Sequence, residues 1–335
     1  MDITDSYNDR AFLSSWTNRI IIINTLVFLY MAWVSGGLTY AEMDVGLFYK
    51  MGAKVPVAIA MGDYWRLLTP VFLHFGIIHF AFNNYMLHVI GNQLEETIGS
   101  TWFLIIYLAS GIAGNLASSV FTVDMGAGAS GAIFGLLGVG FFLESSIGKQ
   151  IERATGKKPK NQVYAMTVLI NLGLGFMIPV IDNAAHIGGL ICGVVLTTTM
   201  VHLRPNRLVR QNKKLGLSIL STAVFLAFFG VYLATNASLV SQRLTQEGDE
   251  ATDYVRKFQM YSQALELTPD NLELRFKRAR ILLFAGELQR ALTDLRLLAD
   301  KPEYHDRLKT LVAELKEVGS DLSWDVSTII EHGQQ

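Results

Sequence analysis

Long apolar runs with few charged residues inside them dominate the first two thirds of the chain. Seven such stretches lie at about 19–38, 68–90, 101–121, 128–146, 162–180, 184–203 and 215–235. Each is near the roughly 20 residues that an α-helix needs to cross a bilayer. A buried helix of a soluble protein would show a polar face, whereas the segment LSILSTAVFLAFFGVYLA shows almost none. The pattern predicts an all-α, polytopic membrane protein.

Charged residues divide the chain into two parts. Only 17% of the 335 residues are charged, and 27 of these 57 residues lie in 1–240 while 30 lie in the much shorter segment 241–335. We therefore expect a short N-terminal segment (1–18), a membrane core (19–203), a basic loop with a seventh transmembrane helix (204–240) and a soluble helical domain (241–335). The net charge of −1 disfavours a nucleic-acid partner.

Basic residues predict the orientation of the helices, because Lys and Arg of short loops prefer the cytoplasm. Two loops are rich in them: Lys149, Arg153, Lys157, Lys158 and Lys160 in the first, and Arg204, Arg207, Arg210, Lys213 and Lys214 in the second. These loops follow the fourth and sixth stretches, so both can lie on one side. The N-terminus is then cytoplasmic, and residues 236–335 lie outside.

Strongly polar residues inside apolar spans are costly and mark candidate functional sites. With the predicted orientation, Ser130 and His186 each lie near the outer start of a span that runs inward. His79 and Asn83, on the second stretch, are four residues apart and therefore share one helix face. A hydroxyl, an imidazole and two further hydrogen-bonding side chains can thus converge from three helices.

This set of groups suits acyl transfer. A serine hydroxyl becomes a competent nucleophile when a neighbouring base, usually a neutral histidine, takes its proton. The tetrahedral intermediate then needs donors aimed at its oxygen, and the free N–H groups at the start of a helix are such donors. Ser130 is placed to use its own N–H, and His79 and Asn83 can add side-chain donors.

Each of these residues also has a simpler interpretation. A serine in a span often bonds the carbonyl four residues before it. The small-residue steps Gly131–Gly135 and Gly189–Gly193 can bring the helices of Ser130 and His186 together, or can serve ordinary packing. Asp182, four residues before His186, is a possible third catalytic residue or a loop residue. The G-x-S-x-G elbow of soluble hydrolases is not matched, because Ala132 occupies its last position.

Several motifs together resemble the rhomboid intramembrane serine proteases over residues 60–200. Trp65-Arg66 resembles the tryptophan–arginine pair of the first outer loop, and HFGIIHFAFNN the H-x-x-x-x-H-x-x-x-N pattern of the second core helix. GASG at Gly128–Gly131 resembles the nucleophile motif, and AHIGGLICG the segment that carries the base. The resemblance implies a six-helix core and cleavage of peptide bonds in or near transmembrane segments.

The resemblance also implies individual roles. Ser130 would be the nucleophile and His186 the base of a dyad, with His79, Asn83 and the Ser130 N–H around the oxyanion. Phe134 stands where the family often has a tyrosine stacked on the histidine, so stacking is kept and a hydroxyl is lost. Glu95 resembles a glutamate that caps the loop after the second helix. Supporting positions are Gly128, Gly131, Gly189, Trp65 and Arg66, and no cofactor or metal is implied.

The charged tail resembles tetratricopeptide repeats. YSQALELTPDN is followed by LELRFKRARILLFAGELQRAL, with Ala279, Gly286 and Ala291 at the spacing of the small residues of that repeat. Only about one and a half repeats are readable, and a generic helical hairpin is the other interpretation. Either form would suit the binding of a protein partner outside the membrane.

Three functions are open at this point. The leading hypothesis is an active serine endopeptidase acting on transmembrane protein substrates among the membrane lipids. The alternative is a non-catalytic rhomboid-like binding or quality-control adaptor, and a transporter is third, although charged pairs at the midplane are missing from the spans. With no organellar transit segment before the first span, we expect a bacterial plasma membrane.

Overall fold

A computed structural model describes residues 14–39, 41–155, 163–203 and 213–332 of the chain, and in these residues the secondary structure is helical. The chain divides into two compact units, residues 1–234 and 235–335. The segments 156–162 and 204–212, which hold much of the two predicted basic loops, lie outside the described residues.

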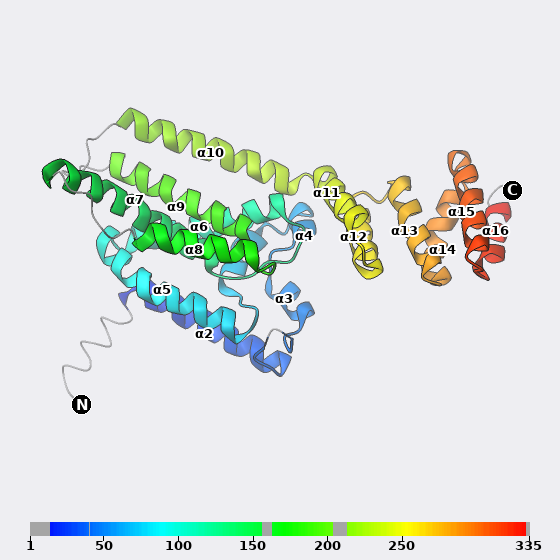
Figure 1. The fold of residues 1–335 in the computed structure, drawn as a ribbon, viewed down its shortest axis with the longest axis horizontal. Coiled ribbons are helices and arrows are strands. Elements are labelled where there is room, and N and C mark those ends of the chain that lie inside the picture. The colour runs from blue at the N-terminus through cyan, green and yellow to red at the C-terminus, as the bar shows by residue number, and fades with distance from the viewer. Residues whose placement is uncertain (1–13, 40, 156–162, 204–212, 333–335) are drawn as a thin grey trace. The chain divides into compact units, whose positions relative to one another are not determined.

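The membrane unit contains seven long helices (Figure 1). They are α2 (Trp16–Ser35), α5 (Gly76–Ile98), α6 (Ser100–Phe121), α7 (Ser130–Thr155), α8 (Val163–Met177), α9 (Asn183–Leu203) and α10 (Lys213–Thr235). Short helices α3 (Val45–Met51), α4 (Pro56–Ala60), η1 (Tyr64–Leu67) and η2 (Thr69–Phe72) form the connection between α2 and α5. Each predicted apolar stretch falls on one long helix, which confirms the all-α polytopic fold.

Length and composition alone qualify four of the described helices to cross a membrane: α2, α6, most of α9 and most of α10. The apolar part of α7, residues 130–146, and the whole of α8 are shorter. Helix α5 is long but carries the histidines and asparagines of the predicted site on its apolar background. These polar side chains lower the mean hydropathy of α5 and so weaken its signal as a membrane span.

The second apolar stretch does not begin and end where it was predicted. The region 68–75 starts with a 3₁₀ turn, Leu73 after it is extended with a ψ of 146°, and α5 begins at Gly76 with a φ of 82°. At its other end α5 continues to Ile98 and stops at Gly99, whose φ is 86°. The prediction of a loop over 91–100 is therefore wrong for most of that segment.

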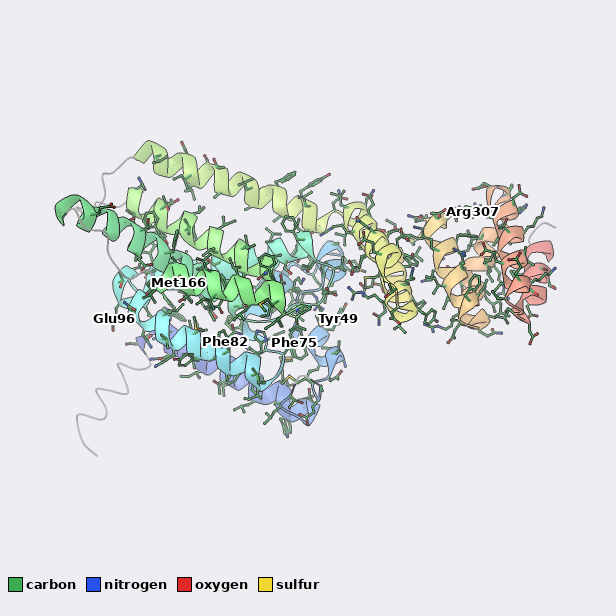
Figure 2. The ribbon with its side chains drawn as sticks, in the orientation of Figure 1. Tyr49, Phe75, Phe82, Glu96, Met166 and Arg307 are labelled. Atoms are coloured by element: carbon green, nitrogen blue, oxygen red, sulfur yellow. The ribbon has the colours of Figure 1, made fainter. Side chains whose placement is uncertain are left out.

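The core of the membrane unit is built by α6, α7 and α9, which pack closely on one another. The outward surface of the unit formed by residues 1–234 is strongly apolar. Phe82 of α5 and Met166 of α8, labelled in Figure 2, are exposed to 53% and 54%, and Phe228 of α10 to 72%. Apolar surface of this extent is unfavourable in water and normal against lipid.

The second unit consists of helices joined by short loops. They are α11 (Ala237–Glu250), α12 (Tyr254–Leu267), α13 (Leu272–Phe284), α14 (Leu288–Ala299), η3 (Pro302–Tyr304), α15 (His305–Glu317) and α16 (Leu322–His332). Ala264, Ala279 and Ala291 are fully buried where helices meet. Successive long helices pair as α11–α12, α13–α14 and α15–α16. The tetratricopeptide assignment stays a prediction.

A buried carboxylate ties α13 to α14. Asp294 is fully buried and accepts hydrogen bonds from Arg275 at 2.9 Å and from Arg278 at 2.7 and 2.9 Å. Both arginines are largely covered, with side-chain exposures of 16% and 20%. Removing the carboxylate would leave two poorly solvated guanidinium groups without their partner.

We expect Asp294→Asn to destabilise this unit by about 3 kcal/mol, because breaking a buried ion pair leaves uncompensated charge. Denaturant unfolding of the full chain, followed by a probe in residues 241–335, measures the change. The matched control is Asp306→Asn. The Asp306 side chain is 99% exposed, and its ion pair with Lys309 is long, at 3.7 Å, so this substitution should change the stability by less than about 0.5 kcal/mol. Equal losses of stability in the two variants would contradict a stabilising role for the ion pairs of Asp294 with Arg275 and Arg278.

Candidate active site

Ser130 is the first residue of α7, at the end of an extended segment that leads from α6. Gly128 has a φ of 137°, which side-chain-bearing residues rarely adopt, and its N–H donates to the carbonyl of Pro70 at 2.9 Å. The hydroxyl of Ser130 is partly exposed, and the N–H groups at the start of α7 have no partners in the preceding turn of a helix. The nucleophile candidate thus stands beside free backbone donors.

His186 lies in the first turn of α9 and is only 7% exposed. Its ring stacks on Phe134 with centroids 4.1 Å apart and planes inclined by 10°. Because Phe134 is four residues after Ser130 on α7, the imidazole lies beside the first turns of that helix. Nδ1 of His186 is buried without a hydrogen-bond partner among the described residues, so packing rather than a hydrogen bond at Nδ1 orients the ring.

Glycines let α7 and α9 touch through their backbones. A Cβ at Gly189 would overlap the carbonyl oxygen of Gly131, and one at Gly193 would overlap that of Gly135. A Cβ at Gly138 would lie 2.6 Å from the carbonyl oxygen of Leu190. Close approach of the two helices through small residues, which the glycine spacing predicted, is therefore confirmed.

Helix α5 brings His79 to the same place. A Cβ at Gly128 would lie 2.8 Å from Nε2 of His79 and 3.8 Å from the hydroxyl of Ser130. The two side chains therefore flank Gly128, and only a glycine leaves room for the imidazole there. His79 thus lies beside the Gly128 turn that leads into Ser130.

Asn83 lies one turn further along α5 and is 3% exposed. Its amide donates to the carbonyl of His79 at 3.0 Å, within its own helix. An amide has two N–H donors, so this contact leaves a second donor for a ligand. Asn84, its neighbour, is bonded to Phe80 and Asn24 instead and ties α5 to α2.

Trp65 and Arg66 organise the connection between α2 and α5. Arg66 is 3% exposed, and its guanidinium donates to the carbonyls of Tyr49 and Ala53 at 2.7 and 3.1 Å and to Asp63 at 2.9 Å. The guanidinium also lies 4.7 Å from the centre of the Trp65 ring. These contacts hold the short helices together and give the pair a structural part.

Glu95 lies in the last turn of α5, which continues to Ile98. The side chain is 5% exposed and receives the backbone N–H groups of Trp16 and Thr17 at 2.8 and 2.9 Å, with the hydroxyls of Ser15 and Thr17 at 2.8 and 2.9 Å. It therefore caps the start of α2 from a neighbouring helix. These hydrogen bonds tie the end of α5 to the start of α2.

Asp182 serves as the cap of α9. One carboxylate oxygen accepts the N–H of Ala185 at 2.9 Å, and the other accepts the hydroxyl of Ser118 on α6. Since Nδ1 of His186 has no hydrogen-bond partner among the described residues, a third catalytic role for Asp182 is not supported. In the described part of the chain no three His, Cys, Asp or Glu side chains gather in a way that could hold a metal ion.

The chain is a polytopic helical membrane protein in which Ser130 begins α7, His186 lies in the first turn of α9 and His79 flanks the Gly128 turn before Ser130. Comparison with known proteins gives the family. The Rhomboid domain family model matches residues 61–203, and YdcA of Bacillus subtilis (strain 168) is 33% identical over 153 residues, covering 45% of this chain and 74% of YdcA. The chain belongs to the rhomboid family.

Two further relatives are named as rhomboid proteases. GluP of Bacillus subtilis (strain 168) is 44% identical over 179 residues, which is 53% of this chain and 33% of GluP. AarA of Providencia stuartii is 29% identical over 250 residues, or 68% of this chain and 86% of AarA. The chain thus spans about a third of GluP, and the match to the family model ends before the tail begins.

Proposed function

We propose that this protein is an intramembrane serine endopeptidase that hydrolyses peptide bonds in or near transmembrane segments of membrane proteins. The observation that carries the proposal is the stack of Phe134 on His186 beside the first turn of α7, together with the glycine contact between α7 and α9. The names of GluP and AarA support the same activity.

In this proposal the hydroxyl of Ser130 attacks the carbonyl carbon of the substrate peptide while His186 takes its proton. The negative oxygen is stabilised by the Ser130 N–H, His79 and Asn83. His186 then protonates the leaving amine, and water hydrolyses the acyl-enzyme. A serine-directed fluorophosphonate probe tests the dyad: it should label the wild type, and Ser130→Ala and His186→Ala should both lose the label. Equal labelling of all three would favour the non-catalytic adaptor.

The arrangement in the membrane is also a proposal, and the two basic loops support it. We place the N-terminus in the cytoplasm and residues 236–335 outside, in a bacterial plasma membrane. Alkaline phosphatase, which is active outside the cytoplasm, should be active when fused after residue 300 and inactive when fused within residues 204–212. The reverse result would overturn the orientation while leaving the dyad untouched.

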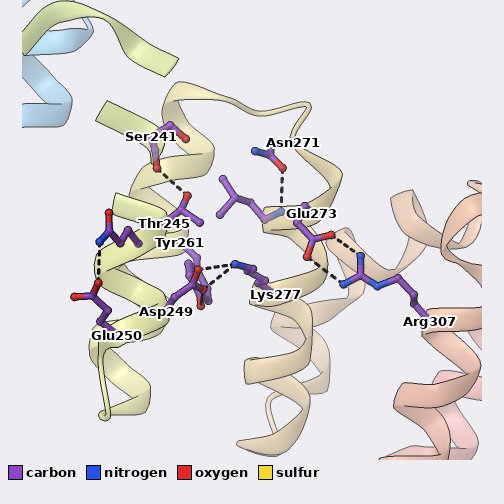
Figure 3. Close-up of polar contacts among 11 residues, drawn as sticks. Ser241, Thr245, Asp249, Glu250, Tyr261, Asn271, Glu273, Lys277 and Arg307 are labelled. Atoms are coloured by element: carbon purple, nitrogen blue, oxygen red, sulfur yellow. Dashed lines mark hydrogen bonds and ion pairs between the residues drawn. The ribbon is translucent and has the colours of Figure 1, made fainter. Parts of the chain in front are cut away.

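The 241–335 domain is proposed to bind a protein partner. A groove of about 650 Å³ on this unit is lined by Tyr254, Lys257, Phe276, Lys277, Phe284 and Arg307, among others. Figure 3 shows how ion pairs brace it: Lys277 bonds Asp249, and Arg307 bonds Glu273. The hydrogen bond from Arg307 keeps the pKa of Glu273 below its usual range. Aromatic faces beside fixed charges suit the docking of a polypeptide segment.

A further inference from the structure

Lys54 is a buried cation that the proposed chemistry does not use. It lies between α3 and α4 in the connection from α2 to α5 and is 1% exposed. Burying an ammonium group is costly unless it is well hydrogen bonded. The surroundings of Lys54 therefore indicate what the charge is for.

The backbone of Lys54 holds the segment that enters Ser130. Its N–H donates to the carbonyl of Gly126 at 2.8 Å, and the N–H of Gly126 donates back to the carbonyl of Lys54 at 2.9 Å. A Cβ at Gly126 would lie 2.9 Å from Cε of Lys54, so the lysine side chain lies directly against this backbone. Gly126 is four residues before Ser130, and the bridge fixes the approach to α7.

The side chain of Lys54 leads to the helix of His186. Nζ donates to the hydroxyl of Ser118 on α6 at 2.7 Å and to that of Thr122, the C-cap of α6, at 2.9 Å. Ser118 in turn donates to the carboxylate of Asp182, which caps α9. The carbonyl of Asp182 also accepts the N–H of His186 at 3.1 Å, so the hydrogen bonds run from Lys54 to the catalytic candidate without a gap.

We propose that Lys54, acting through Ser118 and Asp182, is a positioning residue that sets Ser130 and His186 relative to each other. Its backbone fixes the segment before Ser130, and its ammonium orients the cap of α9 and balances the charge of Asp182. A shared lysine couples two helix starts that no covalent segment joins directly. This inference rests on the proposed peptidase function.

The test compares two neighbouring serines of α6. Ser118→Ala breaks the route to Asp182. Ser119→Ala is the matched control, because Ser119 is also fully buried and its hydroxyl donates within its own helix, to Asn115 at 2.8 Å. Each variant is purified as the full chain, and its kcat and KM are measured on a transmembrane reporter substrate in liposomes, with thermal unfolding measured in parallel.

We expect Ser118→Ala to lower kcat by roughly 10–100-fold, since small misplacements of reacting groups cost this much. KM should stay within about twofold, because the Ser118 hydroxyl is not proposed to contact the substrate. The control Ser119→Ala should have the kcat and KM of the wild type. Lys54→Met should lower kcat similarly. Combining Lys54→Met with Asp182→Asn should cost no more than the worse single variant, as expected of groups that act as one unit.

The positioning role would be overturned by an unchanged kcat in Ser118→Ala, or by equal losses of kcat and thermal stability in Ser118→Ala and Ser119→Ala. Additive effects of Lys54→Met and Asp182→Asn would also contradict it. If Lys54→Met does not fold, the comparison of Ser118→Ala with Ser119→Ala still tests the positioning role. A wild type without Ser130-dependent cleavage would instead overturn the proposed function, and the inference with it.

Discussion

Replacing Ser130 by alanine is expected to abolish cleavage of a transmembrane reporter substrate, with a loss of about 10⁴-fold or more in kcat. The substitution removes only the hydroxyl group, and without it neither His186 nor the backbone donors have a nucleophile to assist. Ser130 is the first residue of α7 and is partly exposed. The variant should therefore fold normally, with a change in stability within about 0.5 kcal/mol.

The measurement is product formation on a gel from purified protein in liposomes, beside probe labelling and a thermal unfolding curve. Ser145→Ala is the control, because Ser145 lies on the same helix and is exposed. It should cleave like the wild type. Cleavage that survives in Ser130→Ala would point to a contaminating protease or to another nucleophile, and a wild type inactive on several substrates would favour the adaptor function.

The sequence predicted the helices of the membrane unit because each needs about 20 apolar residues, and little else produces such runs. It misplaced α5 because apolar character alone does not locate a helix start. Residues 68–75 are as apolar as the helix that follows, yet the extended Leu73 and the left-handed Gly76 keep them out of it. At the other end the apolar run stops near residue 90, whereas α5 continues to Ile98, with Glu95 buried against the start of α2.

The candidate site was predictable to the extent that its residues violate the composition of their surroundings. Ser130, His186, His79 and Asn83 stand out as polar groups in apolar segments. In the structure His79 and Ser130 flank Gly128, and His186 stacks on Phe134, one turn after Ser130. Lys54 gave no such signal. It lies in a mixed connection where a lysine is ordinarily solvated, and its partners Ser118 and Asp182 are 64 and 128 positions away in sequence. Contacts of that kind are set by the tertiary fold.

The backbone contact between α7 and α9 carries the second large prediction. Gly189 is three residues after His186, and Gly131 directly follows Ser130. A Cβ at Gly189 would overlap the carbonyl oxygen of Gly131 and lie 2.7 Å from its carbonyl carbon. Backbone atoms in a helix cannot rotate aside as a flexible side chain can, so even one methyl group must push the helices apart.

We expect Gly189→Ala to destabilise the membrane unit by about 3 kcal/mol, the upper part of the usual range for overpacking, and to lower kcat by roughly 100-fold, because the helices that separate carry Ser130 and His186. Thermal unfolding in detergent and the reporter assay measure the two effects.

The matched control is Gly173→Ala on α8, where a Cβ would meet nothing within 4 Å. Alanine is the better helix former, so this control should be as stable as the wild type or slightly more so. If Gly189→Ala behaved like Gly173→Ala, the two helices would not be in backbone contact. The distance between the nucleophile and base candidates would then have to be set by the hydrogen bonds of Lys54, Ser118 and Asp182 alone.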